Sequence, residues 1–311
     1  MINKKLLKTA ITTLGLLSFS QNSFSNENFL NGWKGYAHIE QAETKYTMDK
    51  ETSPVDNSNP GQPFTRGQLS LNKNFQNGNY LFQYDVSYEA YQMEKRNSDA
   101  TGHIFSNKFN IQRNSDILNL GAFVNYSENS DRGENNGVST SFWHFGTQAN
   151  KFFDNTKTRV GLSYGKVRGD DQEDDGIAVR DAGNNYNIYL QQYFNENLRL
   201  GYSFNLLDGG RDDINGSGGT GDNNKAKVDS HLVNMEYYLS PKYPVALTAS
   251  YELINYKPSL DEPDRPLAKE FKLGIKYIFG GEKSLMAFDK GRISHQANVE
   301  NYWTHFANEI D

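Results

Sequence analysis

The chain has 311 residues, of which 38 are acidic and 32 basic, no cysteine, and a hydrophobic fraction of only 36%. The absence of cysteine excludes disulfides and thiol-linked lipid anchors, and the acidic balance disfavours nucleic-acid partners. With 19 Tyr and 19 Phe, the composition suits either a soluble all-β protein or a β-barrel with a polar interior.

The first 25 residues have the features of a secretory signal peptide: a basic start, an apolar run from Leu6 to Phe19 broken by Lys8, and small residues at Ser23 and Ser25. Cleavage after residue 25 leaves 286 of the 311 residues, and the loss of three lysines lowers the basic count from 32 to 29, for a net charge of −9. No later apolar run reaches the roughly eighteen residues of a membrane helix, so any membrane span must be a strand.

From Trp33 onward, alternating segments of about ten residues are joined in turn by short and long connections, as in up-and-down β structure. The short connections, expected on the periplasmic side, are 74–79, 113–116, 154–156, 195–197 and 241–243. The long ones, expected outside the cell, are 49–62, 95–102, 129–137, 169–183, 208–227 and 258–266. Five short and six long connections make eleven, and eleven connections join twelve strands. An even number of strands is typical of single-chain bacterial barrels.

Every second residue of the predicted strands is apolar, which assigns one face to lipid. The lipid-facing sets are Phe82, Tyr84, Val86, Tyr88; Leu118, Leu120, Ala122, Val124, Tyr126; Val160, Leu162, Tyr164; Leu198, Leu200, Tyr202, Phe204, Leu206; and Val245, Leu247, Ala249, Tyr251, Leu253. None of these sets contains a charge, which would cost about 2 to 4 kcal/mol at the bilayer midplane. A solvated strand face normally carries Lys or Glu, so this absence favours a membrane barrel over a soluble sandwich.

The opposite, inward parity carries Asn, Gln, Ser and charges of both signs, with seven basic and five acidic residues. The predicted pore-lining charges are Lys34, Glu40, Arg66, Asp85, Glu89, Lys108, Arg159, Arg199, Glu236, Glu252, Lys272 and Lys276. Inward glycines are Gly121, Gly146, Gly161, Gly165, Gly201 and Gly274. They either hold a lumen open or ease strand curvature beneath a neighbouring tyrosine.

The last predicted strand, Phe271 to Phe279, alternates strictly for nine residues. The segment contains a polar residue, a glycine and two closing aromatic residues at fixed spacing, which are Lys272, Gly274, Tyr277 and Phe279. Over these eight residues the chain resembles the C-terminal assembly signal of Gram-negative outer-membrane barrels, and as a whole it resembles porin-like barrels, including small monomeric ones for oligosaccharides. The resemblance implies insertion by the barrel-assembly machinery and contact with lipid and lipopolysaccharide.

The predicted organisation is a signal peptide (1–25), a closed antiparallel barrel (26–281) and a 30-residue tail (282–311). In the tail, a set of apolar residues has helical spacing after a possible N-cap at Ser294. The set is Val299, Tyr302 or Trp303, Phe306 and Ile310. Such a helix could plug the lumen, bind a periplasmic partner or lie on the inner leaflet, or the tail could be a weakly ordered extension.

No catalytic constellation is predicted. The six histidines (His38, His103, His144, His231, His295 and His305) show no metal-ligand spacing, and no cofactor is implied. Outer-membrane phospholipases carry His and Ser two residues apart, which is absent here, and the neighbours Ser230 and His231 fall on opposite strand faces. Weak Ca²⁺ or Mg²⁺ candidates among the acidic loops are Asp170, Asp171, Asp174, Asp212 and Asp213, although a solvated polar loop is the favoured explanation of these residues.

A twelve-stranded barrel has at most a narrow pore, since eight strands leave a filled lumen and sixteen or more a wide channel. The leading hypothesis is therefore a porin-like channel for passive diffusion of small hydrophilic solutes, not an enzyme. The alternatives are a non-conducting barrel whose surface loops bind a partner and, less favoured, a hydrolase on the barrel wall. A charge pairing across the closure, of Lys272 and Lys276 with Glu252, Lys34 and Glu40, is expected to set ion selectivity.

Overall fold

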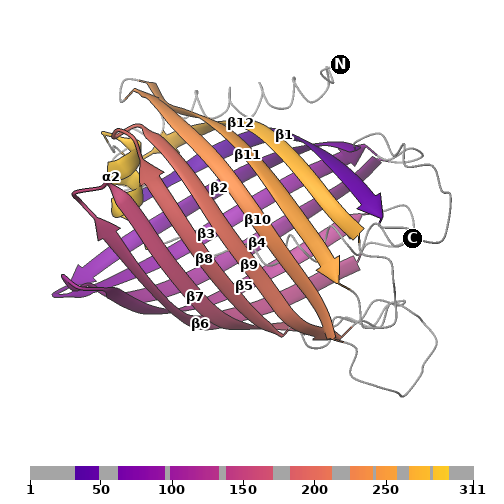
Figure 1. Cartoon of the computed structure of the whole chain (residues 1–311), viewed down its shortest axis with the longest axis horizontal. Coiled ribbons are helices and arrows are strands. Elements are labelled where there is room, and N and C mark those ends of the chain that lie inside the picture. Colours follow the sequence, from indigo (N-terminus) through magenta and orange to yellow (C-terminus); the bar gives the residue numbers. More distant parts are fainter. Residues whose placement is uncertain are drawn as a thin grey trace.

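The protein forms one closed antiparallel β-barrel of twelve strands in a computed structural model (Figure 1). The structure describes residues 32–48, 62–94, 99–132, 138–170, 183–211, 225–240, 243–257, 266–280 and 283–293. The fold class and the strand number predicted from the sequence are confirmed. The signal peptide and the segment from Ser294 onward lie outside the described residues.

Each strand pairs with its neighbours in sequence, and β1 pairs with β12 to close the barrel. The strands are β1 (Trp33–Met48), β2 (Gln62–Asn77), β3 (Tyr80–Glu94), β4 (Asp99–Arg113), β5 (Asn119–Arg132), β6 (Val138–Phe153), β7 (Thr158–Asp170), β8 (Asn184–Tyr193), β9 (Leu198–Arg211), β10 (Lys225–Ser240), β11 (Tyr243–Lys257) and β12 (Pro266–Phe279). The closing pair runs from Gly35 opposite Phe279 to Met48 opposite Pro266. The alternating segment 271–279 therefore lies at the closure.

The connections at one end of the barrel are all short, and those at the other end include the longest, 49–61, 171–183 and 212–224, which defines a short-turn end and a long-loop end (Figure 1). The predicted alternation in length fails at 95–98 and 133–137, which lie at the long-loop end but are no longer than 114–118. At the short-turn end Gly78, with a positive φ of 56°, makes a two-residue turn between β2 and β3. Several strands extend into segments predicted as loops: β4 begins at Asp99, β5 continues to Arg132, and β9 and β10 extend to Arg211 and from Lys225. The predicted loop boundaries were wrong here because ladder pairing continues through polar residues.

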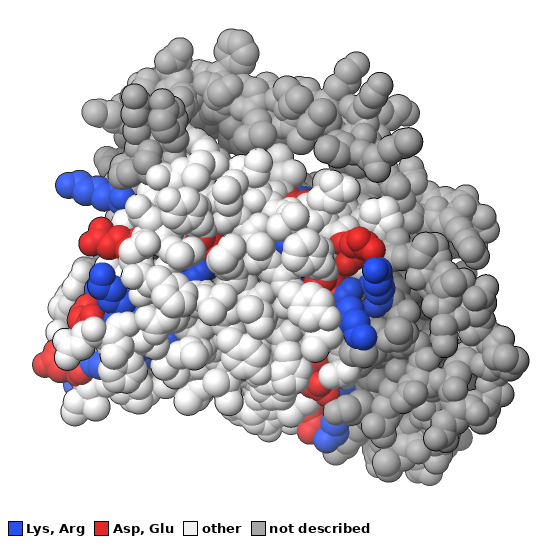
Figure 2. All heavy atoms as spheres, turned by 45° about the horizontal axis from the view of Figure 1, so that its top comes forward, with Lys and Arg blue, Asp and Glu red and all other residues white. Residues whose placement is uncertain are grey.

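Burial alternates along the strands and separates an outer from an inner wall. In β8, for example, Tyr186, Ile188 and Leu190 are exposed, whereas Asn187 and Tyr189 are buried. Leu120, Leu162, Leu200 and Leu247, assigned to the lipid face, are all exposed. Uncharged residues cover most of the outer wall in view, with charged side chains mainly toward its two sides (Figure 2). Exposed Phe75, Tyr80, Phe153 and Phe194 lie at the short-turn end, as in the aromatic girdles of membrane barrels.

The inward glycines differ in what surrounds them. A Cβ atom on Gly161 would lie 2.2 Å from the ring of Tyr189, which is in the neighbouring strand. At Gly161 this close approach favours the explanation that glycine makes room for a tyrosine, whereas at Gly121 and Gly146 a Cβ atom would meet backbone atoms of the neighbouring strand.

A short helix, α2 (Leu285–Lys290), follows the barrel and lies at its short-turn end (Figure 1). Ser284 caps it by accepting a hydrogen bond from the backbone N–H of Ala287 at 3.2 Å. The sequence analysis missed this helix, because six residues are too few for a periodic signal. Among the helical segments that the structure describes, none is long and apolar enough to cross a membrane.

Replacing exposed Leu200 or Leu247 with Arg should destabilise the inserted barrel by about 2 to 4 kcal/mol, because the charge would face hydrocarbon. Urea unfolding of protein refolded into lipid vesicles measures the effect, with Leu247→Ala and the inward Ser250→Arg as controls. Equal losses for Leu247→Arg and Ser250→Arg would contradict the assignment of the two walls.

Candidate functional site

The barrel interior at the short-turn end is filled by α2. Leu285 and Phe288 are 1% and 3% exposed and pack against inward side chains of the wall. Those wall residues are Tyr36, Tyr193, Tyr238, Ala246 and Ile278, with Phe152 at the margin. Burying two large apolar side chains contributes about 3 to 6 kcal/mol, so this apolar contact docks the helix inside the barrel.

Asp289 of α2 is the polar anchor of this contact. Its carboxylate lies 2.6 Å from the Arg199 guanidinium and accepts a 2.6 Å hydrogen bond from the Tyr193 hydroxyl. Arg159 donates to the backbone oxygens of Asp289 and Arg292 at 3.0 and 2.9 Å. These donors satisfy carbonyls at the C-terminal end of the helix, where a cation is also favoured by the helix dipole.

Beyond α2 the chain continues along the inner wall of β3. The Arg292 guanidinium lies 3.4 Å from the Asp85 carboxylate, and the backbone N–H of Ile293 donates to the Gln83 side chain at 2.7 Å. Ile293 is 3% exposed. The described part of the tail therefore lies within the barrel, at its short-turn end.

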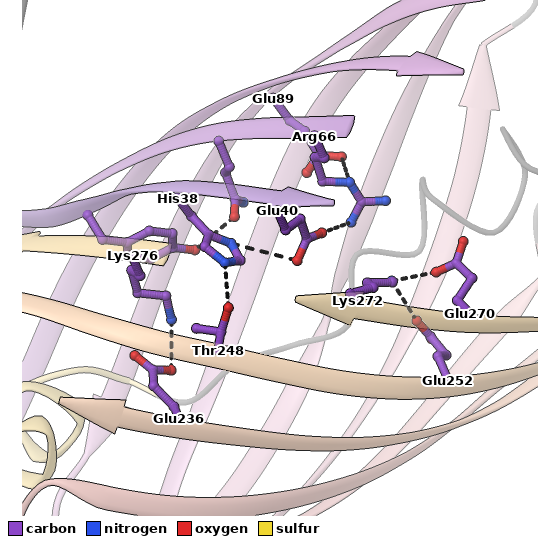
Figure 3. Close-up of polar contacts among 12 residues, drawn as sticks. His38, Glu40, Arg66, Glu89, Glu236, Thr248, Glu252, Glu270, Lys272 and Lys276 are labelled. Atoms are coloured by element: carbon purple, nitrogen blue, oxygen red, sulfur yellow. Dashed lines mark hydrogen bonds and ion pairs between the residues drawn. The ribbon is translucent and has the colours of Figure 1, made fainter. Parts of the chain in front are cut away.

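Two buried ion-pair clusters occupy the inner wall nearer the long-loop end (Figure 3). Arg66 lies between Glu40 and Glu89, at 3.2 and 3.0 Å. Lys272 lies between Glu252 and Glu270, at 3.1 and 2.5 Å. Each cation neutralises carboxylates in a site of low dielectric, where an unpaired charge would be costly.

A third pairing links the wall to α2. Glu236 accepts from Lys276 at 2.8 Å and from Arg199 at 2.8 Å, and Arg199 in turn contacts Asp289. His38 lies between Lys276 and Glu40, with its Nε2 atom 2.9 Å from the Thr248 hydroxyl and its Nδ1 atom 3.9 Å from the Glu40 carboxylate (Figure 3). The charges thus form a connected path from β10 and β12 to the helix.

The pairing proposed across the closure is only partly correct. Lys272 does contact Glu252, but Lys276 contacts Glu236 on β10, and Glu40 contacts Arg66. Lys34 lies beside Gly280 and Gly291 at the short-turn end. Parity alone cannot identify such partners, because strand tilt brings together inward residues two strands apart.

The remaining predicted charges lie in described strands with inward parity. Asp85 is opposite Lys108 in the β3–β4 register, and Arg159 contacts the tail. Two charged residues of these clusters were not predicted from the sequence. Glu270 lies one residue before the alternating segment 271–279. Asp289 lies in the tail, which was not assigned to the lumen.

A cavity of about 300 Å³ lies in the lumen between these charged groups. Its lining extends from Arg199 and Glu236, near α2, to Glu270 toward the long-loop end. Charged, amide and aromatic residues make up much of the lining, including His38, Gln191 and Asn234, and apolar residues such as Leu232 and Met235 also contribute. The cavity can hold a small polar molecule.

The described side chains do not form the two chemical sites considered from the sequence, a metal site and the Ser230–His231 pair. No group of three or more His, Asp or Glu residues in the described ranges could hold a metal ion. Of the acidic candidates, Asp170 ends β7, and Asp171, Asp174, Asp212 and Asp213 lie outside the described residues. Ser230 is fully buried, whereas His231 lies against the outward Phe204 ring at 5.0 Å. A nucleophile and its base must face one another, so these two cannot act together.

No protein-family model matches the chain, and no curated protein matches its sequence. Solved outer-membrane barrels do match its structure. An outer-membrane channel from Pseudomonas putida F1 has a TM-score of 0.55 at 14% identity, covering 79% of this chain and 95% of that one. The translocator domain of autotransporter NalP from Neisseria meningitidis has a TM-score of 0.44 at 12% identity, covering 88% and 97%. Outer membrane phospholipase A from Escherichia coli has a TM-score of 0.42 at 11% identity, covering 78% and 92%.

These identities show the fold alone. The chain has the fold of outer-membrane β-barrels, in agreement with the resemblance inferred from its sequence. The assembly signal at Lys272, Gly274, Tyr277 and Phe279 stays a prediction.

Arg66→Met should destabilise the barrel by about 3 to 5 kcal/mol, because it leaves the buried Glu40 and Glu89 without their shared cation. The matched control is Lys45→Met, which removes the exposed 3.3 Å pair with Glu43 and should cost less than about 1 kcal/mol. Urea unfolding in lipid vesicles measures both. Equal losses would show that the buried cluster contributes no more than a surface pair.

Proposed function

We propose that the protein is an outer-membrane channel for small hydrophilic solutes, with α2 closing its short-turn end in the state described here. The observation that carries this proposal is the contrast between the two walls. The outer wall is apolar, while the inner wall is lined by amides and paired charges around a cavity of about 300 Å³. A soluble barrel has no need for such an outer wall, and a purely structural barrel has no need for such a cavity.

The direction of insertion follows from the chain ends. In bacterial outer-membrane barrels the short turns face the periplasm, and a signal peptide delivers the chain from that side. In this orientation α2 faces the periplasm and the long loops face the outside. Membrane lipid, lipopolysaccharide and the barrel-assembly machinery are the partners expected of this insertion.

The helix can act as a displaceable plug. A six-residue helix is not stable by itself in water, so α2 depends on Leu285, Phe288 and Asp289 docking to the wall. Undocking would release the short-turn end of the lumen without breaking any strand pair. Passive diffusion would then be limited by the population of the undocked state.

A permanently closed barrel is the second candidate, and the docking of α2 favours it. In that case the polar interior would serve only to stabilise the fold, and the loops at the other end would provide the function. Conductance separates the two candidates.

Asp289→Ala should increase channel opening, because α2 loses its contacts with Arg199 and Tyr193. A loss of about 3 kcal/mol corresponds to roughly a hundredfold change in the ratio of docked to undocked helix. Single-channel recording of the refolded mature chain in a planar bilayer measures it, with Asp116→Ala in the 114–118 turn as the control. If neither the mature chain nor Asp289→Ala conducts, while both show heat-modifiable gel mobility, the channel proposal is wrong.

Lys276→Gln should shift the reversal potential toward cations. The change removes one positive charge from the lumen wall and leaves Glu236 paired only with Arg199. The shift should be larger at low salt, where screening is weaker. Lys73→Gln, which removes a cation from above the outward Trp33 ring, serves as the control. An unchanged reversal potential in a conducting Lys276→Gln channel would remove this pair from the selectivity pathway.

A further inference from the structure

The cavity has a side formed by three consecutive strands, β8, β9 and β10. Gln191, Gly201 and Asn234 lie opposite one another in the two registers, with the glycine in the middle. A Cβ atom at Gly201 would lie 2.5 Å from the Asn234 side-chain oxygen. The missing side chain therefore lets the Asn234 amide lie over Gly201, in the strand between Asn234 and Gln191.

This side of the cavity carries buried acceptors without partners. The side-chain oxygens of Asn187, Gln191 and Asn234 have no hydrogen bond among the described residues. Asn187 and Gln191 are only 3% and 9% exposed, and all three residues line the cavity. Leaving a buried polar atom unpaired costs about 1 to 3 kcal/mol, so these oxygens favour a ligand that donates hydrogen bonds.

Two further unpaired atoms lie beside them. Within the described part of the chain, Oε1 of Glu236 and Nε of Arg199 also have no hydrogen-bond partner. Both residues line the same cavity and are at most 5% exposed. The wall thus offers several acceptors and one donor, which hydroxyl groups can match because each hydroxyl both donates and accepts.

The formal charge of the lining is balanced. Its four basic residues are Arg66, Arg199, Lys272 and Lys276, and its four acidic residues are Glu40, Glu236, Glu252 and Glu270. The basic groups already contact carboxylates at 3.2 Å or less. A charged ligand would have to compete with these pairs, whereas a neutral one would not.

The size of the cavity limits the ligand. A volume of about 300 Å³ corresponds to roughly ten water molecules and is at the small end of known ligand sites. It suits a single sugar ring or a short polyol.

We propose that the cavity beside Gly201 is a binding site for a neutral polyhydroxylated solute of hexose size, held by the amides of Asn187, Gln191 and Asn234. The inference deepens the proposed channel function, since it names the solute class that the lumen selects. The amide oxygens accept hydrogen bonds from ligand hydroxyl groups, and Nε of Arg199 donates a hydrogen bond to one ligand hydroxyl oxygen.

Equilibrium dialysis of the refolded full mature chain with radiolabelled glucose tests the proposal without requiring conductance. Glucuronate and glucosamine are matched probes, because they differ from glucose by a carboxylate and an ammonium group. The variant Gln191→Ala with Asn234→Ala removes two acceptors, and Gln148→Ala with Asn125→Ala removes the same two residue types from the inner wall outside the cavity. Heat-modifiable gel mobility confirms that each variant is folded.

Saturable glucose binding is expected, with weaker binding of both charged analogues. Loss of two hydrogen bonds should weaken glucose binding about tenfold in the first variant, and the second should bind as the original chain does. Any of three results would overturn the site: no saturable glucose binding, equal binding of glucuronate, or unchanged glucose binding in the Gln191→Ala, Asn234→Ala variant. If no saturable binding is found, only water satisfies the amides. Binding without conductance would instead leave the site in place and reject the channel.

Discussion

The hydrogen-bonded closure between β1 and β12 is the constraint on which the rest of the structure depends. Within a bilayer each unsatisfied backbone group costs several kcal/mol, so a strand array in lipid is stable only if its first and last strands meet. The fourteen-residue pairing of β12 with β1 meets this condition. Closure also gives every strand an inside and an outside, and the period-two alternation then determines which side chains face lipid.

Pairing of opposite charges follows from that enclosure. Glutamates on the inner wall are nearly out of contact with bulk water, and each of the three clusters places a Lys or Arg against them. The shared neutralisation keeps the lining charge of the cavity balanced. In the proposed channel, the amides of β8 and β10 would therefore select polar solutes together with these charges.

The described part of the tail, 283–293, lies inside the barrel rather than extending from it. Leu285 and Phe288 cover inward aromatic residues that would otherwise face water at the short-turn end, and Asp289 joins the same ion-pair network as Glu236 through Arg199. One network therefore contacts both the plug and the cavity. A charged solute that competed for Arg199 would also disturb the anchor of α2, whereas a neutral solute would leave it in place.

The sequence by itself determined the twelve strands, their order and the two walls, because a period of two over segments such as 271–279 has only one reading in a closed sheet. It also assigned charges such as Glu40, Arg66 and Lys272 to the inward parity. It did not determine the ends of the strands, since pairing continues through polar residues such as Glu128 to Arg132, nor the helix at 285–290, which is too short to show periodicity. Only the tertiary structure decided that Lys276 meets Glu236, that Asp289 meets Arg199, and that Gln191 and Asn234 flank Gly201. Those contacts depend on strand tilt and register, which bring together residues far apart in the chain and leave no local signal in the sequence.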